Sequence, residues 1–231
     1  NVNYLLNPYN FTINIKTINP QILLEGKKIG IKNIQTNVSL KSLINDQFSI
    51  DDLQITTKEI KVNDIILLLR AFKDSPKLLV LNNFIKGGFI IANINLNFDE
   101  KGNIEEDYKI SGYAKKIKLN ILNQVKLQNF NFNFNVDKSN YLLKEIDMKL
   151  NNVKVTSPLI EIKKKKNSFF VNGQLLNNNN NFDIKDLKSI FTNLFNIIDI
   201  RKIEFSSKNN FSFNVNKNLK FDNFKVESVV D

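Results

Sequence analysis

Two acidic clusters come closest to a catalytic pattern in this sequence, Asp51–Asp52 and Glu105–Asp107. A pair of carboxylates held close together can perform acid–base chemistry, as in glycoside hydrolysis. Both clusters fall at expected turns or strand starts among lysines, where carboxylates are ordinarily solvated. We therefore expect surface carboxylates at these positions and no catalytic pair.

The residue inventory excludes most other catalytic sites. The 231-residue chain contains no His and no Cys, which excludes Ser–His and Cys–His nucleophile pairs, an imidazole general base and ordinary zinc sites. Gly87–Gly88 lacks the glycine spacing that follows in nucleotide-binding loops. We expect a protein that is not an enzyme and that needs no metal and no cofactor.

Lysine forms the densest charged cluster, at Lys163–Lys166, in a chain of formal net charge +10. Such a cluster can bind the phosphates of an anionic membrane surface or of nucleic acid. The excess of Lys and Asn fits A/T-rich codon usage, and no aromatic residue is interleaved with these lysines as a stacking platform. We interpret the cluster as a solvated hairpin tip and expect no nucleic-acid partner.

Strict alternation of apolar and polar residues is the strongest signal of secondary structure. Phe130, Phe132 and Phe134 alternate with asparagines, which are poor strand formers. The apolar side must hold this strand in a sheet, because a slip of one residue would expose the phenylalanines to water. The same alternation predicts strands within residues 48–56, 89–98, 108–121, 141–150, 158–163 and 169–175.

The connecting segments are short and rich in turn residues, which predicts consecutive hairpins. The turns are expected at residues 99–103, 137–140, 164–167, 207–210 and 216–218. Hairpins in series place each strand antiparallel beside the next. The sequence thus predicts a mainly β fold, a long twisted antiparallel sheet, with a bulge or turn at Asp51–Asp52 where the alternation changes phase.

Two segments have helical periodicity instead, near residues 63–84 and 183–199. Apolar residues spaced at i, i+3, i+4 and i+7 mark an amphipathic helix, and Asn63 or Asp64 and then Asp183 are suitable N-terminal caps. Residues 177–181 are five consecutive asparagines and predict a loop. Each helix could pack on the apolar face of a curved sheet.

We treat residues 1–231 as a single β-rich segment, and the first residue, Asn1, suggests an excerpt of a longer chain. Alternation alone leaves two interpretations of the apolar face open. It is either a closed core or an open groove for acyl chains, in which each buried CH₂ group contributes about 0.8 kcal/mol. The residues nominated for lipid contact are Ile94, Leu96, Phe98, Ile110, Phe130, Phe132, Phe134, Phe211 and Phe213.

Three segments follow one another from residue 39, namely a strand-to-turn segment at Ser39–Ile44, a strand at Phe48–Ile55 and a short helix at Asp64–Phe72. This succession resembles the AsmA-like superfamily of bacterial envelope proteins, which includes TamB- and YhdP-type members. The paired strands of residues 85–121 are also similar to strands of those proteins. The resemblance spans most of the chain and includes no catalytic motif.

The resemblance implies a sheet curved into a half-pipe or groove with an apolar interior. It implies a location in the periplasm, an inner-membrane anchor outside this chain, and phospholipid acyl chains as the partner. The implied function is phospholipid transport between inner and outer membrane, or maintenance of the outer membrane. The alternative that we keep is a structural or protein-binding β domain with a closed apolar core and no ligand.

Overall fold

The computed structural model describes residues 1–24, 26–72, 78, 82–121, 125–151, 153–183, 202–216, 218 and 220–231. The fold is mainly β, as predicted, with one long antiparallel sheet and few short helices. The strands of the first half are β1 (Val2–Asn7), β2 (Thr12–Ile18), β3 (Gln21–Leu24), β4 (Lys27–Ser39), β5 (Ile50–Thr57), β6 (Ile60–Lys61) and β7 (Ile85–Asn97).

The second half of the chain contributes longer strands. They are β8 (Lys109–Ile121), β9 (Val125–Val136), β10 (Asn140–Leu150), β11 (Val153–Lys164), β12 (Ser168–Asp183), β13 (Lys202–Asn216) and β14 (Phe221–Val230). Two helices complete the described elements, α1 (Leu40–Ile44) and α2 (Val62–Phe72).

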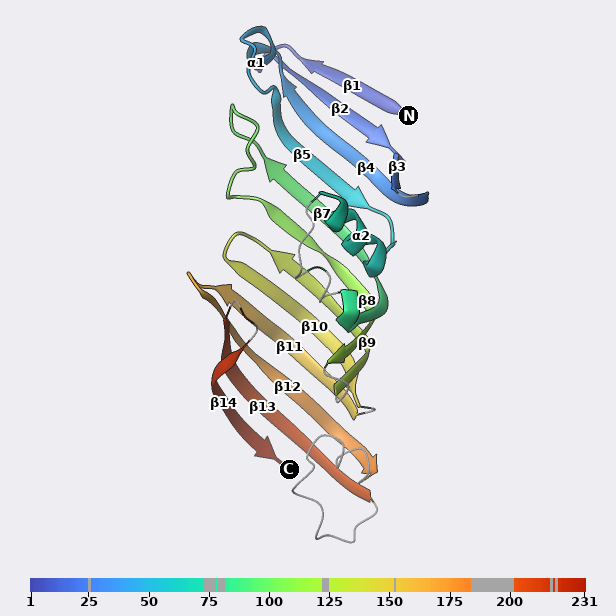
Figure 1. Ribbon diagram of the computed structural model, residues 1–231, viewed down its shortest axis with the longest axis vertical. Coiled ribbons are helices and arrows are strands. Elements are labelled where there is room, and N and C mark those ends of the chain that lie inside the picture. The colour runs from blue at the N-terminus through green and yellow to red at the C-terminus, as the bar shows by residue number, and fades with distance from the viewer. Residues whose placement is uncertain are drawn as a thin grey trace.

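The sheet is a meander in which neighbours along the chain are mostly neighbours in space. Its order is β1-β2-β4-β5-β7-β8-β9-β10-β11-β12-β13-β14, with β3 paired to β4 and β6 paired to β7 beside this path. Figure 1 shows the strands following one another along the long axis of the molecule, from blue β1 to red β14. The sheet stays open, because β1 and β14 lie at opposite ends of this order.

Three of the predicted turns, at residues 99–103, 137–140 and 164–167, each join two paired strands. The turn predicted at 216–218 falls between the paired strands β13 and β14, and its residue 217 lies outside the described residues. The predicted turn at 207–210 is wrong, because these residues lie inside β13, where Ser207 faces Asn177 and Asn210 faces Gln174. Their polarity resembles that of a turn, but cross-strand pairing with β12 keeps them extended.

The asparagine run was also predicted wrongly as a loop. Residues 177–181 belong to β12, which extends to Asp183 and pairs with β13. Buried Asn177 donates a hydrogen bond from Nδ2 to the backbone oxygen of Phe205, at 2.8 Å. This bond satisfies an amide that would otherwise be costly to bury, so tertiary contacts override the low strand propensity of Asn.

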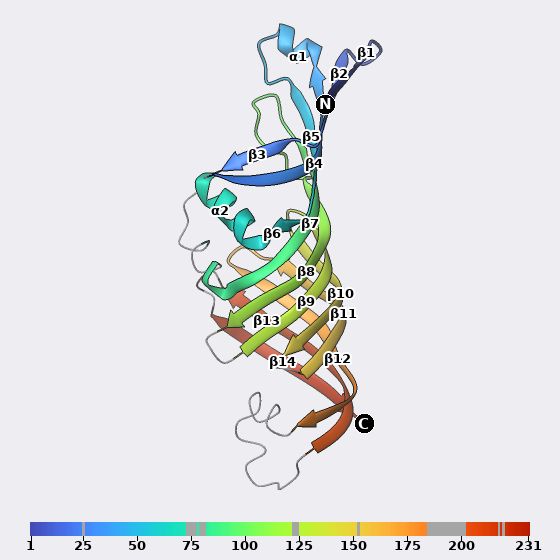
Figure 2. The same cartoon turned by 90° about the vertical axis from the view of Figure 1, so that its right-hand side faces the viewer.

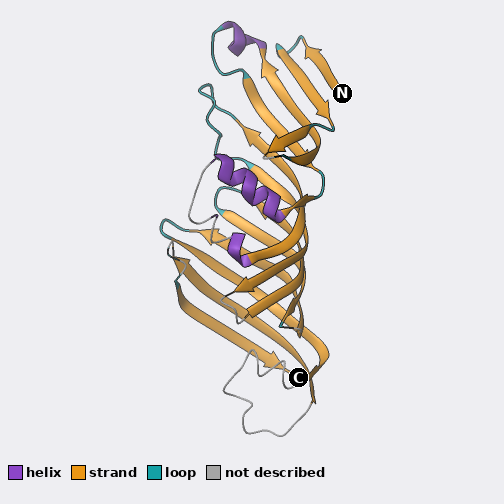
Figure 3. Cartoon of the chain, turned by 45° about the vertical axis from the view of Figure 1, so that its right-hand side comes forward, coloured by secondary structure: helices purple, strands orange, loops and turns teal. Residues whose placement is uncertain are grey.

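The helix predicted near residues 63–84 is present as α2, and Asn82–Phe84 form a further helical turn before β7. The helix predicted at 183–199 lies outside the described residues, apart from Asp183, which ends β12. Figure 3 shows α2 lying across one face of the sheet. In Figure 2, strands β7–β9 curl toward that same side.

Bulges allow the apolar side chains to stay on one face along the longest strands. At the β8–β9 bulge, the apolar spacing widens from two residues to three, between Ala114 and Ile117. The backbone N–H of Lys116 there donates a hydrogen bond to Asn131 Oδ1, at 2.8 Å. The predicted irregularity at Asp51 is a bulge of the same kind, between β4 and β5. Lys116 has positive φ, and polar residues with positive φ also occupy other shifts in register, at Asn129, Glu145 and Asn223.

Two buried clusters form the core, and both lie against the middle of the sheet. One contains Val62 and Ile66 of α2, packed on β7 and β8, and the other contains residues of β10 and β11. Phe130 and Phe132 of β9 contact both clusters. The core is therefore continuous from α2 to β11 along one face of the sheet. Its buried members are Val62, Ile66, Ile85, Ala114, Ile117, Ile146, Met148, Val153 and Val155.

Candidate functional site

The register of the sheet aligns apolar side chains into a row that crosses it from β1 to β13. Each residue of this row, here called the Val2 row, faces the next one across a strand pair, and Thr17 is its one polar member. Because directly opposed residues point to the same face, the row is a continuous strip on one side of the sheet. It consists of Val2, Thr17, Ile34, Ile55, Ile94, Ile110, Val136, Tyr141, Ile162, Val171 and Phe213.

A second row runs beside the first and extends to the last strand. This Ala92 row holds Ala92, Gly112, Phe134, Leu143, Ile160, Gly173, Phe211 and Val226. It lies two residues along each strand from the Val2 row, so the two rows share a face. Together they form an apolar strip along the long axis of the sheet.

The nominated lipid-contact residues all lie on this face. Ile94, Ile110 and Phe213 belong to the Val2 row, and Phe134 and Phe211 to the Ala92 row. The other four extend these rows: Phe132 faces Ala114, Phe130 faces Ile117, Leu96 faces Leu53, and Phe98 packs on Phe48 with ring centroids 5.5 Å apart. All nine side chains are half-buried.

The sequence analysis missed several members of the rows. Tyr141, Leu143, Ile160 and Ile162 lie on β10 and β11 in the middle of the strip. Only Ile160 and Ile162 are separated by a polar residue, Glu161, whereas Tyr141, Leu142 and Leu143 are consecutive apolar residues that do not show which side faces the core. What the sequence did not provide is the register, which places them beside Phe134 and Val171.

Two glycines of the Ala92 row are each covered by a phenylalanine on the strand opposite. A Cβ atom at Gly112 would lie 2.7 Å from Phe134 Cζ, and one at Gly173 would lie 2.9 Å from Phe211 Cζ. Each phenylalanine therefore folds over the backbone of the glycine that it faces, an arrangement that supports a glycine within a sheet. The rings fill the gaps in the row that glycine would otherwise leave.

Aromatic contacts continue along β13 to the last strand. The rings of Phe211 and Phe213 are stacked with centroids 6.0 Å apart, and Phe213 also contacts Phe221 at 5.6 Å and Phe224 at 6.0 Å. Offset and tilted contacts of this kind are favourable between aromatic rings. Phe221 and Phe224 remain largely exposed, so this end of the apolar face is open to solvent.

Helix α2 covers the apolar face over β7–β9. Ile66 is 2% exposed, and it packs in a cluster with Ala114, which is fully buried, and Ile117. Here the face is a closed core. On either side of α2, residues such as Ile34, Tyr141 and Ile162 are half-exposed, and the rows continue without interruption.

The opposite face of the sheet is mixed, with many charged and amide side chains but also the exposed apolar residues Ile91, Tyr113 and Leu159. A hollow of about 490 Å³ lies on this face over β11–β14 and is lined partly by Glu161, Asn172, Gln174 and Lys225. Gly173 and Phe211 of the Ala92 row also line it, so the hollow and that row share these two positions.

The acidic clusters take structural positions at the strand ends. Asp52 accepts hydrogen bonds from the amide (3.2 Å) and side chain (2.7 Å) of Asn37 across the β4–β5 pair. Partial burial, followed by the charge on Asp52, raises the pKa of Asp51. Glu106 forms an ion pair with Lys138, and Asp107 accepts a bond from Asn97, at 2.7 Å.

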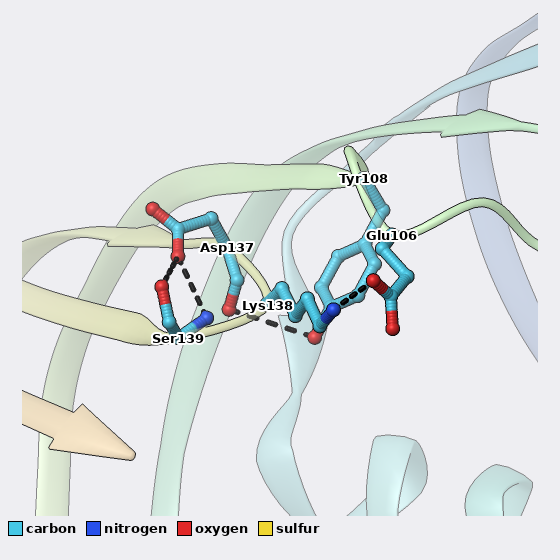
Figure 4. Close-up of polar contacts among 5 residues, drawn as sticks. All are labelled: Glu106, Tyr108, Asp137, Lys138 and Ser139. Atoms are coloured by element: carbon cyan, nitrogen blue, oxygen red, sulfur yellow. Dashed lines mark hydrogen bonds and ion pairs between the residues drawn. The ribbon is translucent and has the colours of Figure 1, made fainter. Parts of the chain in front are cut away.

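The hairpin at 137–140 shows how these contacts hold two turns together. Asp137 Oδ1 accepts bonds from the amides of Ser139, at 2.9 Å, and Asn140, at 2.8 Å. Figure 4 shows Asp137 bonded to Ser139, and Lys138 reaching Glu106 in the neighbouring β7–β8 connection. The amide donors lower the pKa of Asp137. At the other turn, bonds from Asn103 and then Lys101 lower the pKa of Asp99.

The lysine cluster is exposed at the β11–β12 turn. Lys163 pairs with Glu161, with 3.0 Å between Nζ and Oε2, and the Lys165 ammonium lies 4.8 Å from the centre of the Phe170 ring. Both partners lie beside the lysines on the same hairpin. The cluster therefore has local partners that partly neutralise or cover it.

Comparison with known proteins finds no matching family model, no matching curated sequence and no matching solved structure. Within the described part of the chain, no helix has the length and apolar character needed to cross a membrane. The same residues contain no cluster of three or more acidic side chains suited to hold a metal ion. The function is therefore inferred from the register, burial and side-chain chemistry of the sheet.

Proposed function

We propose that this chain is a segment of a passive hydrophobic groove that holds phospholipid acyl chains. The supporting observation is the pair of apolar rows, which run along the sheet from β1 to β14 and are half-exposed at most positions on both sides of α2, Val171 being buried. In an AsmA-like envelope protein, such a groove would carry phospholipid between the inner and outer membranes or serve outer-membrane maintenance. This setting implies a periplasmic location and an inner-membrane anchor outside this chain.

The chemistry of the rows suits acyl chains. Aliphatic and aromatic side chains offer no fixed polar group, so binding would follow from the area of hydrocarbon removed from water, about 25 cal/mol per Å². A strip without polar anchors would bind many acyl chains with little selectivity and would let them slide along the rows. The charged and amide side chains of the outer face would keep the other side of the sheet in water.

Over part of the sheet, the packing of α2 favours the alternative function, a domain with a closed apolar core. Under α2 the apolar face is a closed core, as expected for a structural or protein-binding β domain without a ligand. Phe132 lies in this region and contacts both buried clusters, so Phe132→Asp would unfold the protein under either function. Positions away from α2 distinguish the two functions better.

The test is the phospholipid content of the purified protein after expression in bacteria, measured by mass spectrometry of organic extracts. The wild type should carry phospholipid. Ile34→Asn and Ile162→Asn, which place amides in the rows on either side of α2, should each lower the bound lipid, about threefold or more when combined. The outward substitutions Gln35→Asn and Lys163→Asn are matched controls and should leave the lipid content unchanged.

A protein that carries no phospholipid and takes up none from vesicles would contradict the proposed function and favour a closed structural domain. Equal lipid loss in inward and outward variants would also contradict it. Circular dichroism on each variant checks that the sheet remains folded.

A further inference from the structure

Four lysines from neighbouring strands form a basic patch on the outer face of the sheet, away from α2. They lie on β8–β11, in the middle of the sheet, and each of these strands is paired on both sides. Each lysine is next in sequence to a residue that packs in one of the two buried clusters, so its own side chain points to the opposite face. This Lys118 patch consists of the exposed residues Lys118, Lys126, Lys149 and Lys154.

The register of the sheet brings the four lysines together. Lys149 directly opposes Lys154 in the β10–β11 pair. On its other side, Lys149 opposes Gln128 of β9, which lies two residues after Lys126. Lys118 of β8 faces the same stretch of β9, where the register shifts between residues 127 and 130. Because neighbouring strands lie about 4.8 Å apart, the patch crosses about 14 Å of the sheet.

The charges within the patch are only partly balanced. Like charges directly opposite each other destabilise a strand pair, as Lys149 and Lys154 do here. Two carboxylates lie on the same stretch of β10: Asp147 Oδ1 is 4.0 Å from Lys154 Nζ, and Glu145 accepts a hydrogen bond from Asn133, at 2.6 Å. Asp147 and Lys154 are both more than half exposed, so solvent weakens their attraction. Four lysines with two carboxylates leave this stretch of the face positive.

The lysine cluster at the β11–β12 turn is less suited to bind one surface. Its lysines are consecutive, so those within β11 alternate between the two faces and the others lie in the turn. Figure 1 shows this turn on the long side of the sheet that also carries the β7–β8 connection, with its acidic cluster Glu105–Asp107. The Lys118 patch lies toward the other side and presents all four lysines on one face.

We infer that the Lys118 patch docks on the surface of a bilayer that contains anionic phospholipids. Such a surface supplies the negative charge that the directly opposed Lys149 and Lys154 lack, and each lysine close to it adds to the attraction. The lysines lie on paired strands, so little backbone freedom is lost when they bind. The patch and the apolar rows lie on opposite faces, so docking leaves the rows uncovered. The inference goes beyond the proposed groove and does not depend on it.

The surroundings of the patch favour a membrane surface over nucleic acid. The side chains beside the lysines on this face include Asn120, Gln128 and Thr156. None of these three is an aromatic ring on which a base could stack. In Figure 2 the strands β7–β9 curl away from this face, which is therefore convex there. A convex face can rest on a bilayer, whereas proteins that bind single strands hold the backbone in a basic groove.

Co-sedimentation with vesicles tests the docking. At roughly 0.1 M salt, the wild type should bind vesicles in which about a third of the phosphatidylcholine is replaced by phosphatidylglycerol, and should bind pure phosphatidylcholine vesicles much less. Raising the salt to roughly 1 M, where the Debye length falls to about 3 Å, should release most of the protein. The triple variant Lys118→Gln, Lys149→Gln and Lys154→Gln should lower partitioning onto the anionic vesicles by at least about tenfold.

A matched variant separates the patch from the net charge of the chain. Lys163→Gln, Lys165→Gln and Lys166→Gln remove the same charge from the β11–β12 turn and should lower the partitioning by less than about threefold. Replacing the three patch lysines with arginine keeps their charge and should keep the binding. The substituted lysines are all exposed, so each variant should remain folded, which circular dichroism checks.

No binding to the anionic vesicles, equal binding to pure phosphatidylcholine vesicles, or an equal loss in the two glutamine variants would overturn the inference. So would an oligonucleotide that binds as tightly as the anionic vesicles in a filter assay at the same salt and is lost in the same patch variant. The row variants Ile34→Asn and Ile162→Asn should lower the lipid content without lowering vesicle binding. The failure of the groove and the failure of the docking are therefore distinguishable.

Discussion

At the scale of single residues, the polar side chains hold turns and bulges while the apolar ones form the rows. Asp99 and Asp137 each accept bonds from turn amides, and Lys116 adopts positive φ at a bulge. The sequence predicted the two turns from their residue types. It also predicted the irregularity at Asp51, since the alternation of apolar residues changes phase there.

Glycine at position 112 is required by space. A Cβ atom there would overlap the backbone oxygen of Ile91 and approach Phe134 Cζ. Gly112→Ala should therefore lower the free energy of unfolding by about 2 kcal/mol, the typical cost of overpacking. At Gly30 the nearest atom would be the flexible Lys58 Cδ, at 3.2 Å, so Gly30→Ala should cost little. Urea denaturation of both variants checks this, and equal losses would contradict the packing of Phe134 over Gly112.

The turn carboxylates predict a pH dependence. The lowered pKa values of Asp99 and Asp137 mean that their stabilising effect is complete above the unfolded pKa, near 4. It is lost as the pH falls through the lower, folded values. The pKa of Asp51 is raised, so its ionised carboxylate lowers the stability of the folded state, and this unfavourable effect is relieved as the pH falls.

The wild type should therefore lose more stability between about pH 5 and pH 3 than a variant with Asp99→Asn and Asp137→Asn, in which those charges are absent. Urea unfolding at both pH values measures the difference. Because Asp51 is present in both proteins, its contribution cancels. An identical loss in the two proteins would show that these turns do not depend on the carboxylate charges.

At the scale of elements, the sequence predicted strands well where alternation was strict and failed where polarity resembled a loop. Residues 177–181 and 207–210 lie on the paired strands β12 and β13, where Asn177 faces Ser207, Asn180 faces Phe205 and Asn210 faces Gln174. Each segment alone has little reason to be extended, and the pairing that extends it is not visible in either segment by itself. Helix α2 was predictable from its apolar spacing. Which strands the helix packs on was not predictable from that spacing.

Helix α2 should contribute to stability through one fully buried side chain. Ile66→Ala should lower the free energy of unfolding by about 3 kcal/mol, since it removes buried methyl groups and leaves a cavity over Ala114 and Ile117. Leu43 of α1 is 60% exposed, so Leu43→Ala should change the free energy of unfolding by less than about 0.5 kcal/mol. Denaturant unfolding compares the two. A small effect of Ile66→Ala would mean that α2 is not firmly packed on the sheet.

At the scale of the whole molecule, the strand register decides what the alternation means. Alternation fixed one apolar side for each strand, and the register joins those sides into the Val2 and Ala92 rows. Buried and half-exposed apolar residues occupy different stretches of one face: α2 covers it over β7–β9, a second buried cluster lies on β10 and β11, and half-exposed row residues such as Ile34 and Ile162 lie beyond them. The proposed lipid contact belongs to those open stretches.

Site-specific photocrosslinking during lipid uptake tests this account most directly. A photoreactive phenylalanine analogue replaces Phe213, on the apolar face, or Asn210, on the polar face of the same strand, and the protein is incubated with phospholipid vesicles. Mass spectrometry then detects adducts. The account predicts phospholipid adducts at position 213 and few or none at position 210. No adduct at position 213, or equal yields at both positions, would contradict an open lipid-binding groove.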